Sequence, residues 1–124
     1  MEMTTSKNYS VGIDIGSVSL NCIVVNSKKE IVFESAYKRH FGKIDEEILA
    51  LVEELFEQFD QAQIRSISFT GSHGKKLAER LGVFYEFETI SQVLGALHLI
   101  PDAKSFICMG GQDTALLQIH HEGD

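Results

Sequence analysis

The run from 11 to 17, Val-Gly-Ile-Asp-Ile-Gly-Ser, constrains the fold of this chain more than any other segment. Apolar residues alternate in it with glycine and aspartate, which predicts a β-strand with one apolar face and Asp14 on the opposite face. A second strand-like run, 18–25, follows directly. The pattern therefore predicts two strands joined by a tight glycine turn, with a carboxylate close to the turn.

Such a turn suits a metal-bound phosphate. Backbone N–H groups approach a phosphate where no side chain blocks them, and a carboxylate faces the cation. An acid within an apolar strand costs free energy unless it is paired or holds a cation, which favours this interpretation over a plain turn. We expect Asp14 to be catalytic and a metal ligand, and Gly12, Gly16 and Ser17 to bind the phosphates.

Composition excludes several classes of function. The chain has 124 residues, 44% of them hydrophobic, and a net charge of −7, so a single globular domain is expected and a nucleic-acid partner is not. Its two cysteines form no C-x-x-C motif, and no apolar run approaches the ~20 residues of a membrane span. The polar segment 1–8 lacks a secretion signal. It is expected to be disordered, and the protein to be cytoplasmic.

Hydrophobic periodicity predicts an α/β fold, with a mixed sheet that starts with three antiparallel strands and has flanking helices. The basic stretch 38–43 is interpreted as mobile, and Thr89-x-x-Gln92 as a capping box that opens a helix. The expected strands are 9–15, 20–25, 30–37, 64–69, 104–109 and 113–119, with an extended piece at 84–87, and the expected helices are 44–60, one ending at Leu81 before the C-cap Gly82, and one ending before Pro101.

Two further glycine turns are candidate sites. Gly110, Gly111, Gln112 and Asp113 repeat the plan of strand, glycine turn and strand. There Asp113 is a candidate catalytic and metal-binding residue, and Gln112 a candidate for orienting an attacking water, although a polar turn without function fits equally well. Gly71 opens a strand-to-helix turn that aims N–H groups at an anion, but the spacing of the P-loop is absent. The histidines, among them His40, remain unassigned.

Taken in order along the chain, these motifs resemble the BadF/BadG/BcrA/BcrD ATPase family, which includes activators of 2-hydroxyacyl-CoA dehydratases and subunits of benzoyl-CoA reductase. The segments that carry the resemblance are Gly12–Ser17, Thr70–Gly74, Pro101–Ala103 and Gly110–Asp113. The resemblance implies a ribonuclease H-like domain of the actin-like ATPase superfamily. ATP and Mg²⁺ would lie between two such lobes, with Asp14, Gly16 and Ser17 in the first phosphate turn and Gly110 to Asp113 in the second.

The resemblance also implies an activity and partners. ATP hydrolysis would drive an electron into an acyl-CoA dehydratase or reductase component, from a [4Fe-4S] cluster shared by a homodimer. The cysteines that hold this cluster are expected outside this chain, since neither Cys22 nor Cys108 matches them. Residues 9–103 would form the N-terminal lobe and 104–124 a hairpin that opens the second lobe. The chain is therefore expected to be a fragment that is inactive alone and binds nucleotide weakly or not at all.

Three positions depart from the family's pattern: Val18, Asn21 and Cys108. Cys108 replaces an acid that usually precedes the double glycine, which removes a candidate magnesium contact. One alternative is therefore a degenerate, non-catalytic repeat with a scaffolding or regulatory role. A small-molecule kinase of the same superfamily is another alternative, although no residue that would bind its acceptor is evident.

Overall fold

The computed structural model describes residues 8–109 and 114–122. Contacts divide the chain into two compact units, Met1–Tyr85 and Glu86–Asp124. Except for residue 8, the segment expected to be disordered lies outside the described residues. The boundary between two lobes after residue 103 stays a prediction.

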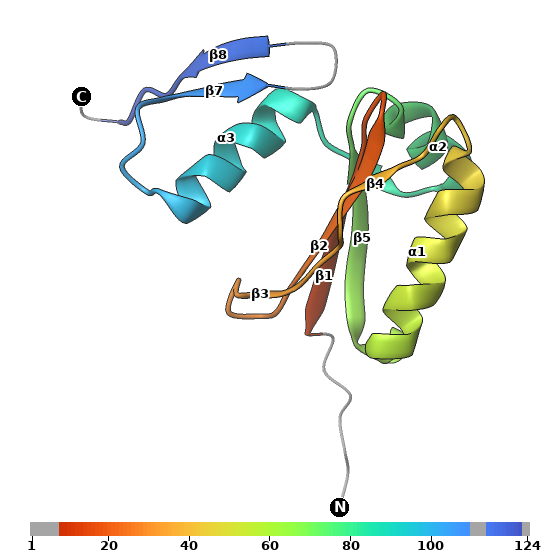
Figure 1. The fold of residues 1–124 in the computed structure, drawn as a ribbon. Helices are drawn as coiled ribbons and strands as arrows, with labels where there is room; N and C mark the ends of the chain where they lie inside the picture. Colours follow the sequence, from red (N-terminus) through yellow and green to blue (C-terminus); the bar gives the residue numbers. More distant parts are fainter. Residues whose placement is uncertain (1–7, 110–113, 123–124) are drawn as a thin grey trace, which may run out of the picture. The chain divides into compact units, whose positions relative to one another are not determined.

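The first unit is built on one mixed sheet (Figure 1). Its strand order is β3-β2-β1-β5-β6, and β4 pairs with β2 beside β3. The pairs β1–β2 and β2–β3 are antiparallel, whereas β1–β5 and β5–β6 are parallel, so the mixed sheet and its antiparallel start are confirmed. The strands are β1 (Tyr9–Ile15), β2 (Ser19–Val25), β3 (Ile31–Glu34), β4 (Lys38–Arg39), β5 (Ile64–Thr70) and β6 (Phe84–Tyr85).

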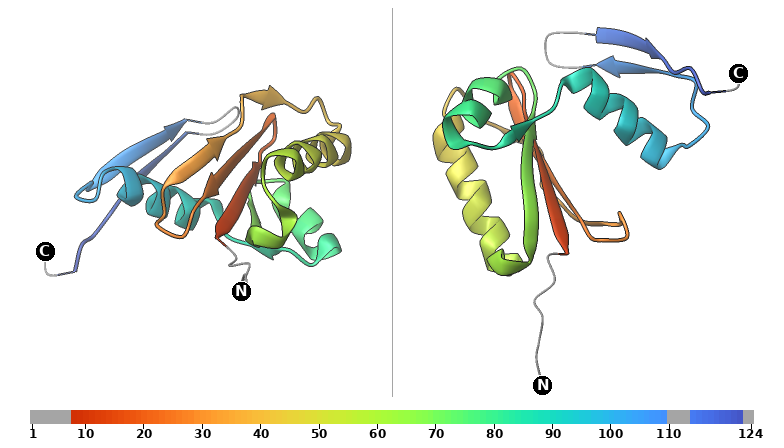
Figure 2. Two further views of the ribbon diagram at one scale, coloured as in Figure 1. Left: turned by 90° about the horizontal axis from the view of Figure 1, so that it is seen from below. Right: turned by 180° about the vertical axis from the view of Figure 1, so that it is seen from behind.

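Two helices cover one face of this sheet. Helices α1 (Ile44–Gln58) and α2 (Gly74–Leu81) lie on the same side of the strands, and a 3₁₀ turn (Gln61–Gln63) precedes β5 (Figures 1 and 2). Their apolar side chains pack on the inward residues of β1 and β2 because alternation places every second side chain on that face. The buried core consists of Val11, Ile13, Ile15, Leu20, Cys22, Val24, Ile48, Leu51, Leu55, Phe69, Leu77 and Ala78.

The segment 38–43 is not the mobile stretch that its basic composition indicated. Lys38 and Arg39 form β4, which pairs antiparallel with the start of β2. The next residue, His40, is 4% exposed. A two-residue strand pairs through its backbone and carries too few side chains to show a period of two, so the sequence pattern does not reveal it.

The second unit holds α3 (Glu88–Leu99), β7 (Ser105–Met109) and β8 (Thr114–Gln118). Strands β7 and β8 form an antiparallel pair, with Cys108 opposite Ala115, as the predicted hairpin requires. The predicted capping box is wrong, because α3 begins at Glu88 after Phe87 and no side chain caps it. Within the described ranges, none of the helices has the length and apolarity needed to cross a bilayer.

Candidate phosphate-binding site

Asp14 lies where the antiparallel and parallel halves of the sheet meet. It is the penultimate residue of β1, with Asn21 of β2 opposite on one side and Thr70 of β5 opposite on the other. The neighbours Ile13 and Ile15 are fully buried on the helix-covered face, so Asp14 points to the other face, as predicted. Its Oδ1 atom is nevertheless buried.

The turn between β1 and β2 carries two of the predicted phosphate-binding residues, Gly16 and Ser17. The Gly16 N–H donates a hydrogen bond of 3.0 Å to the Ser19 carbonyl, which closes a tight turn around Ser17. Gly12 lies further back on β1, exposed, and a Cβ there would meet no atom within 4 Å. The surface next to Gly12 is therefore open, whereas the turn itself is held by its own backbone.

Gly71 comes from a segment distant in sequence and lies against Asp14. Its φ is +97°, a conformation that favours glycine, and a Cβ there would stand 2.5 Å from Asp14 Oδ1 and closer still to the Ile15 carbonyl oxygen. The His73 N–H donates to that same carbonyl at 2.9 Å. The structure thus joins the turn after β5 to the end of β1, and it brings Asp14, Gly16 and Gly71 together.

Tyr85, which the sequence did not single out, fixes the turn that contains Gly71. Its hydroxyl donates to the Gly71 carbonyl at 3.1 Å, and the Gly74 N–H donates to the same oxygen at 3.1 Å. Gly74 also packs close to the ring, since a Cβ there would lie 3.3 Å from Tyr85 Cε1. A tyrosine in a two-residue strand gives no sequence signal for this role, because the contact depends on the path of the fold.

His40 is a second residue that the sequence left unassigned. Its Nε2 lies 2.8 Å from the Gly16 carbonyl oxygen, and its backbone N–H donates to the Val18 carbonyl at 3.0 Å. Its Nδ1 accepts the Gly42 N–H at 3.0 Å. His40 therefore binds the carbonyl groups on one side of the first glycine turn. The sequence gives no sign of this contact, because His40 lies 24 residues beyond the Gly16–Ser17 turn.

The predicted second turn cannot be placed against this site. Gly110, Gly111, Gln112 and Asp113 all lie outside the described residues, so their roles stay predictions. The flanking residues Met109 and Thr114 form the last described pair of β7 and β8. Cys108, the residue in place of the expected acid, lies in β7 and is partly exposed.

The donor set around Asp14 fits Mg²⁺ held together with a nucleotide. Across residues 8–109 and 114–122, no three histidine, cysteine or acidic side chains gather into a cage for a metal ion. Mg²⁺ usually keeps several waters and uses one or two carboxylates with phosphate oxygens. A single carboxylate beside a glycine turn therefore meets the protein's share of such a site, while an all-protein site is not supported.

Cys22 is unsuited to catalysis or to metal binding. It is a buried free thiol, and burial, reinforced by the charge of Glu54, raises its pKa to about 12. Thiolates are the nucleophiles and the metal ligands, so a cysteine kept protonated serves neither purpose. Cys22 is therefore a structural thiol within the buried core.

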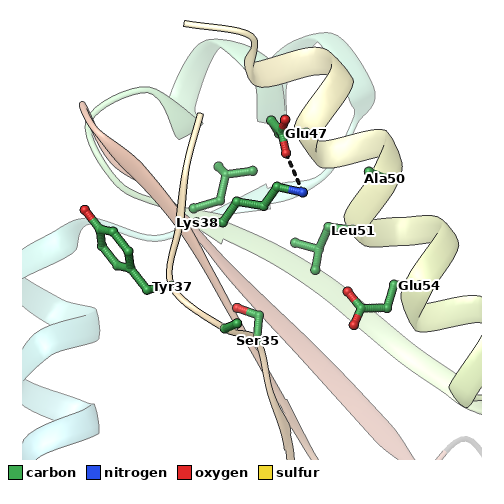
Figure 3. A pocket seen from close by; sticks show the side chains of 9 residues that line it. Ser35, Tyr37, Lys38, Glu47, Ala50, Leu51 and Glu54 are labelled. Carbon is green, nitrogen blue, oxygen red and sulfur yellow. Dashed lines mark ion pairs between the residues drawn. The ribbon is translucent and has the colours of Figure 1, made fainter. Parts of the chain in front are cut away.

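A separate cavity of about 230 Å³ lies between α1 and the segment from β3 to β4 (Figure 3). Two of its charged residues are engaged with each other, since Lys38 Nζ lies 2.8 Å from Glu47 Oε2, and this bond raises the pKa of Lys38. Its volume is below the ~300 Å³ from which ligand pockets usually start. None of the predicted site residues lines it, so it does not compete with the turn at Asp14.

The chain is similar to known proteins over most of its length. No protein-family model matches the chain. The chain is 24% identical over 113 residues to the (R)-2-hydroxyglutaryl-CoA dehydratase activating ATPase of Acidaminococcus fermentans. The match covers 91% of the chain and 43% of that relative, so the chain spans less than half of the relative's length.

Solved structures of two activators have the same fold. Component A of the (R)-2-hydroxyglutaryl-CoA dehydratase from A. fermentans superposes with a TM-score of 0.78 at 23% identity, over 91% of this chain and 43% of that one. The activator of the 2-hydroxyisocaproyl-CoA dehydratase from Clostridium difficile, with bound ADPNP, superposes with a TM-score of 0.69 at 20% identity, over 90% of this chain and 41% of that one.

A Ppx/GppA enzyme of Aquifex aeolicus is a more distant neighbour, with a TM-score of 0.52 at 14% identity over 90% of this chain and 52% of that one. These neighbours confirm the predicted fold class, a ribonuclease H-like domain of the actin-like type. They also confirm the predicted resemblance: over nine-tenths of its length, the chain is similar in sequence and in fold to ATPases that activate 2-hydroxyacyl-CoA dehydratases.

Proposed function

We propose that this chain supplies a nucleotide-binding lobe of an ATPase that activates an acyl-CoA dehydratase or reductase. The observation that carries the proposal is the contact between Gly71 and Asp14, which joins two glycine turns around one carboxylate. The relatives support it, since one is a dehydratase-activating ATPase and another was solved with bound ADPNP.

In this proposal the backbone binds the phosphates and Asp14 binds the metal ion. The Ser17 N–H donates to a phosphate oxygen, since the Gly16 N–H already binds the Ser19 carbonyl, and the absence of a side chain at Gly12 leaves room beside the turn. Asp14 holds Mg²⁺, directly or through its water. A Mg²⁺ ion held there would offset the phosphate charge, which matters for a chain with a net charge of −7.

The chemistry assigned to this lobe is positioning and electrostatics. Phosphoryl transfer to water needs an aligned nucleophile and stabilised negative charge more than covalent help. We assign the charge stabilisation to Asp14 through its cation, and we keep Gln112 and Asp113 as candidates for orienting the water and holding the metal shell. Closure of two lobes around the nucleotide would report its state to the partner.

The partner is a CoA-substrate dehydratase or reductase component, and the whole protein works as a cytoplasmic homodimer. Support comes from the relative's own description as a dehydratase-activating ATPase. The cysteines of this chain do not fit an iron–sulfur cluster, because Cys22 is held protonated and Cys108 alone cannot supply the four thiolates that a cluster takes. Any cluster would therefore use cysteines from outside this chain, and no step is assigned to one here.

Titration of the chain with the magnesium complex of ADPNP, followed by the amide signals of the ¹⁵N-labelled protein, tests the proposal. We expect saturable shifts at Gly16, Ser17 and Gly71 at millimolar ligand. Magnesium with AMP, which lacks the β- and γ-phosphates, is the matched control and should leave these amides in place. Shifts confined to the basic pair Lys75 and Lys76, or equal responses to both nucleotides, would contradict the proposal.

A further inference from the structure

His40 is the one polar or charged residue of the described chain that is buried. It follows β4 and precedes α1. Its hydrogen bonds link three parts of the first unit. Its ring touches the turn after β1 and the loop before α1, while its backbone continues the pairing of β4 with β2. Buried imidazoles are held by hydrogen bonds at both nitrogens when they have a structural or positioning role.

The hydrogen bonds assign the tautomer of the His40 ring. Nδ1 lies 3.0 Å from the Gly42 nitrogen and accepts its N–H, so Nδ1 carries no proton. The ring proton is then on Nε2, which donates to the Gly16 carbonyl oxygen at 2.8 Å. The loop makes this possible by turning sharply, since Phe41 and Gly42 have φ values of 50° and 79° and bring the Gly42 N–H back onto the ring.

The bond from His40 sets the direction of one peptide group. The described chain has no cis peptide bond, and in a trans peptide the C=O and the following N–H point in opposite directions. Because His40 Nε2 binds the Gly16 carbonyl, the N–H of Ser17 points away from His40. The His40 N–H holds the Val18 carbonyl toward the same side, so both carbonyls of the turn are drawn to the histidine.

We propose that His40 is a positioning residue for phosphate binding: it draws the Gly16 and Val18 carbonyls to the rear of the turn and so presents the Ser17 N–H to a nucleotide phosphate. This role rests on the proposed function of the turn. A peptide free to flip would present a carbonyl oxygen to the phosphate, which repels it. The histidine removes that alternative without touching the nucleotide itself.

Two variants separate the hydrogen bond from simple filling of space. His40→Phe keeps a ring of similar size but has no donor for the Gly16 carbonyl. His40→Gln keeps an amide donor and an amide acceptor. The matched control is His98→Phe, since His98 is exposed on α3 in the other compact unit. Each chain is titrated with the magnesium complex of ADPNP, and the affinity is read from the Ser17 amide.

We expect His40→Phe to bind about fivefold more weakly or worse, the effect of one net hydrogen bond. His40→Gln should recover at least part of the loss, and His98→Phe should match the wild type. A uniform loss of fold would move every amide, so the variants are compared only where the signals of α1 and β5 are unchanged. If His40→Phe does not fold, the comparison of His40→Gln with His40→Asn, whose shorter amide falls short of Gly16, replaces it.

The ring nitrogens of the wild-type chain give an independent signal. Nitrogen NMR of the labelled imidazole should show a protonated Nε2 and an unprotonated Nδ1, with slow exchange of the Nε2 proton. The opposite tautomer would overturn the proposal, as would equal affinities of the wild type and a folded His40→Phe. If the wild-type turn itself gives no response to the nucleotide, the proposed function fails, and the role of His40 fails with it.

Discussion

Gly71 lies so close to Asp14 that a Cβ atom at position 71 would stand 2.5 Å from the carboxylate oxygen Oδ1. Asp14 lies near the end of β1, and Gly71 directly follows β5. The two strands pair in parallel, with Asp14 opposite Thr70. A side chain at position 71 would therefore separate the two turns that the proposed phosphate site needs together. Both the packing of these two turns and the proposed site therefore require glycine, which has no Cβ atom, at position 71.

Three glycine-to-alanine substitutions should form a graded series. Gly71→Ala combines a φ of +97° with a backbone overlap, and we expect a loss of about 2–4 kcal/mol in the free energy of unfolding. Gly82→Ala has a φ of +69° but meets no atom, so about 1 kcal/mol is expected. Gly12→Ala has neither problem and should change stability by less than about 0.5 kcal/mol.

Urea denaturation followed by circular dichroism measures the series. The order Gly71, Gly82, Gly12, from the largest loss to the smallest, is the expected outcome. A Gly71→Ala variant as stable as Gly12→Ala would mean that the turn does not lie against the end of β1.

Tyr85→Phe tests the support of the Gly71 turn. The variant loses the hydroxyl that donates to the Gly71 carbonyl at 3.1 Å, and the expected cost is about 1 kcal/mol. Hydrogen exchange of the Gly74 amide should become faster, because its acceptor is the same carbonyl. Tyr37→Phe is the control, since Tyr37 is 69% exposed and should change neither quantity. Equal effects of the two variants would show that the Tyr85 hydroxyl does not stabilise the turn.

Ser35→Ala tests the hydrogen bonds that join β2 to the residue directly after β3. The Ser35 hydroxyl oxygen accepts the Cys22 N–H at 2.8 Å, and the Ser35 N–H donates to the Cys22 carbonyl at 2.9 Å. Removing the hydroxyl leaves a part-buried backbone donor without this acceptor, at an expected cost of about 1–2 kcal/mol in the free energy of unfolding. The exposed Ser66 provides the control variant Ser66→Ala. A Ser35→Ala chain with the stability of that control would show that water replaces the hydroxyl without cost.

The buried thiol of Cys22 should make stability fall at high pH. Burial raises the pKa of Cys22 from 9.0 to about 12, so the folded state keeps the proton that the unfolded state releases earlier. The stability that this provides is complete below pH 9.0 and is lost as pH rises through about 12. Lysines and tyrosines titrate in the same window. The test is therefore the difference between the wild type and Cys22→Ala in urea denaturation across that range. Parallel pH profiles would contradict the assignment.

Alternation of side chains was enough to predict the strand that carries Asp14. A period of two over 11–16 put the isoleucines on the helix-covered face and Asp14 on the other, as the structure confirms. The C-cap at Gly82 was equally readable, because a left-handed φ of 69° at the end of a helix favours glycine. These features are local, and local patterns encode them.

Contacts between distant segments could not be predicted from the sequence. His40 was assigned to a mobile basic stretch, although its ring binds Gly16, because β4 pairs through two residues only and leaves no hydrophobic pattern. Thr89 and Gln92 matched a capping box, yet α3 starts one residue before Thr89, so a helix start was placed correctly to within two residues while its cap was wrong. The meeting of Gly71 with Asp14 required the parallel pairing of β1 with β5, which no single segment specifies.

The central claim is that Asp14 and the turns around it hold a metal-bound nucleotide, and Mn²⁺ tests it most directly. Mn²⁺ substitutes for Mg²⁺ and broadens the amide signals of residues close to it. With ADPNP present, we predict that trace Mn²⁺ broadens the signals of Ile13, Ile15 and Gly71 first, and that Asp14→Asn removes this effect while the chain stays folded. Broadening centred instead on Glu47 and Glu54 beside the α1 cavity, or unchanged in Asp14→Asn, would contradict the claim.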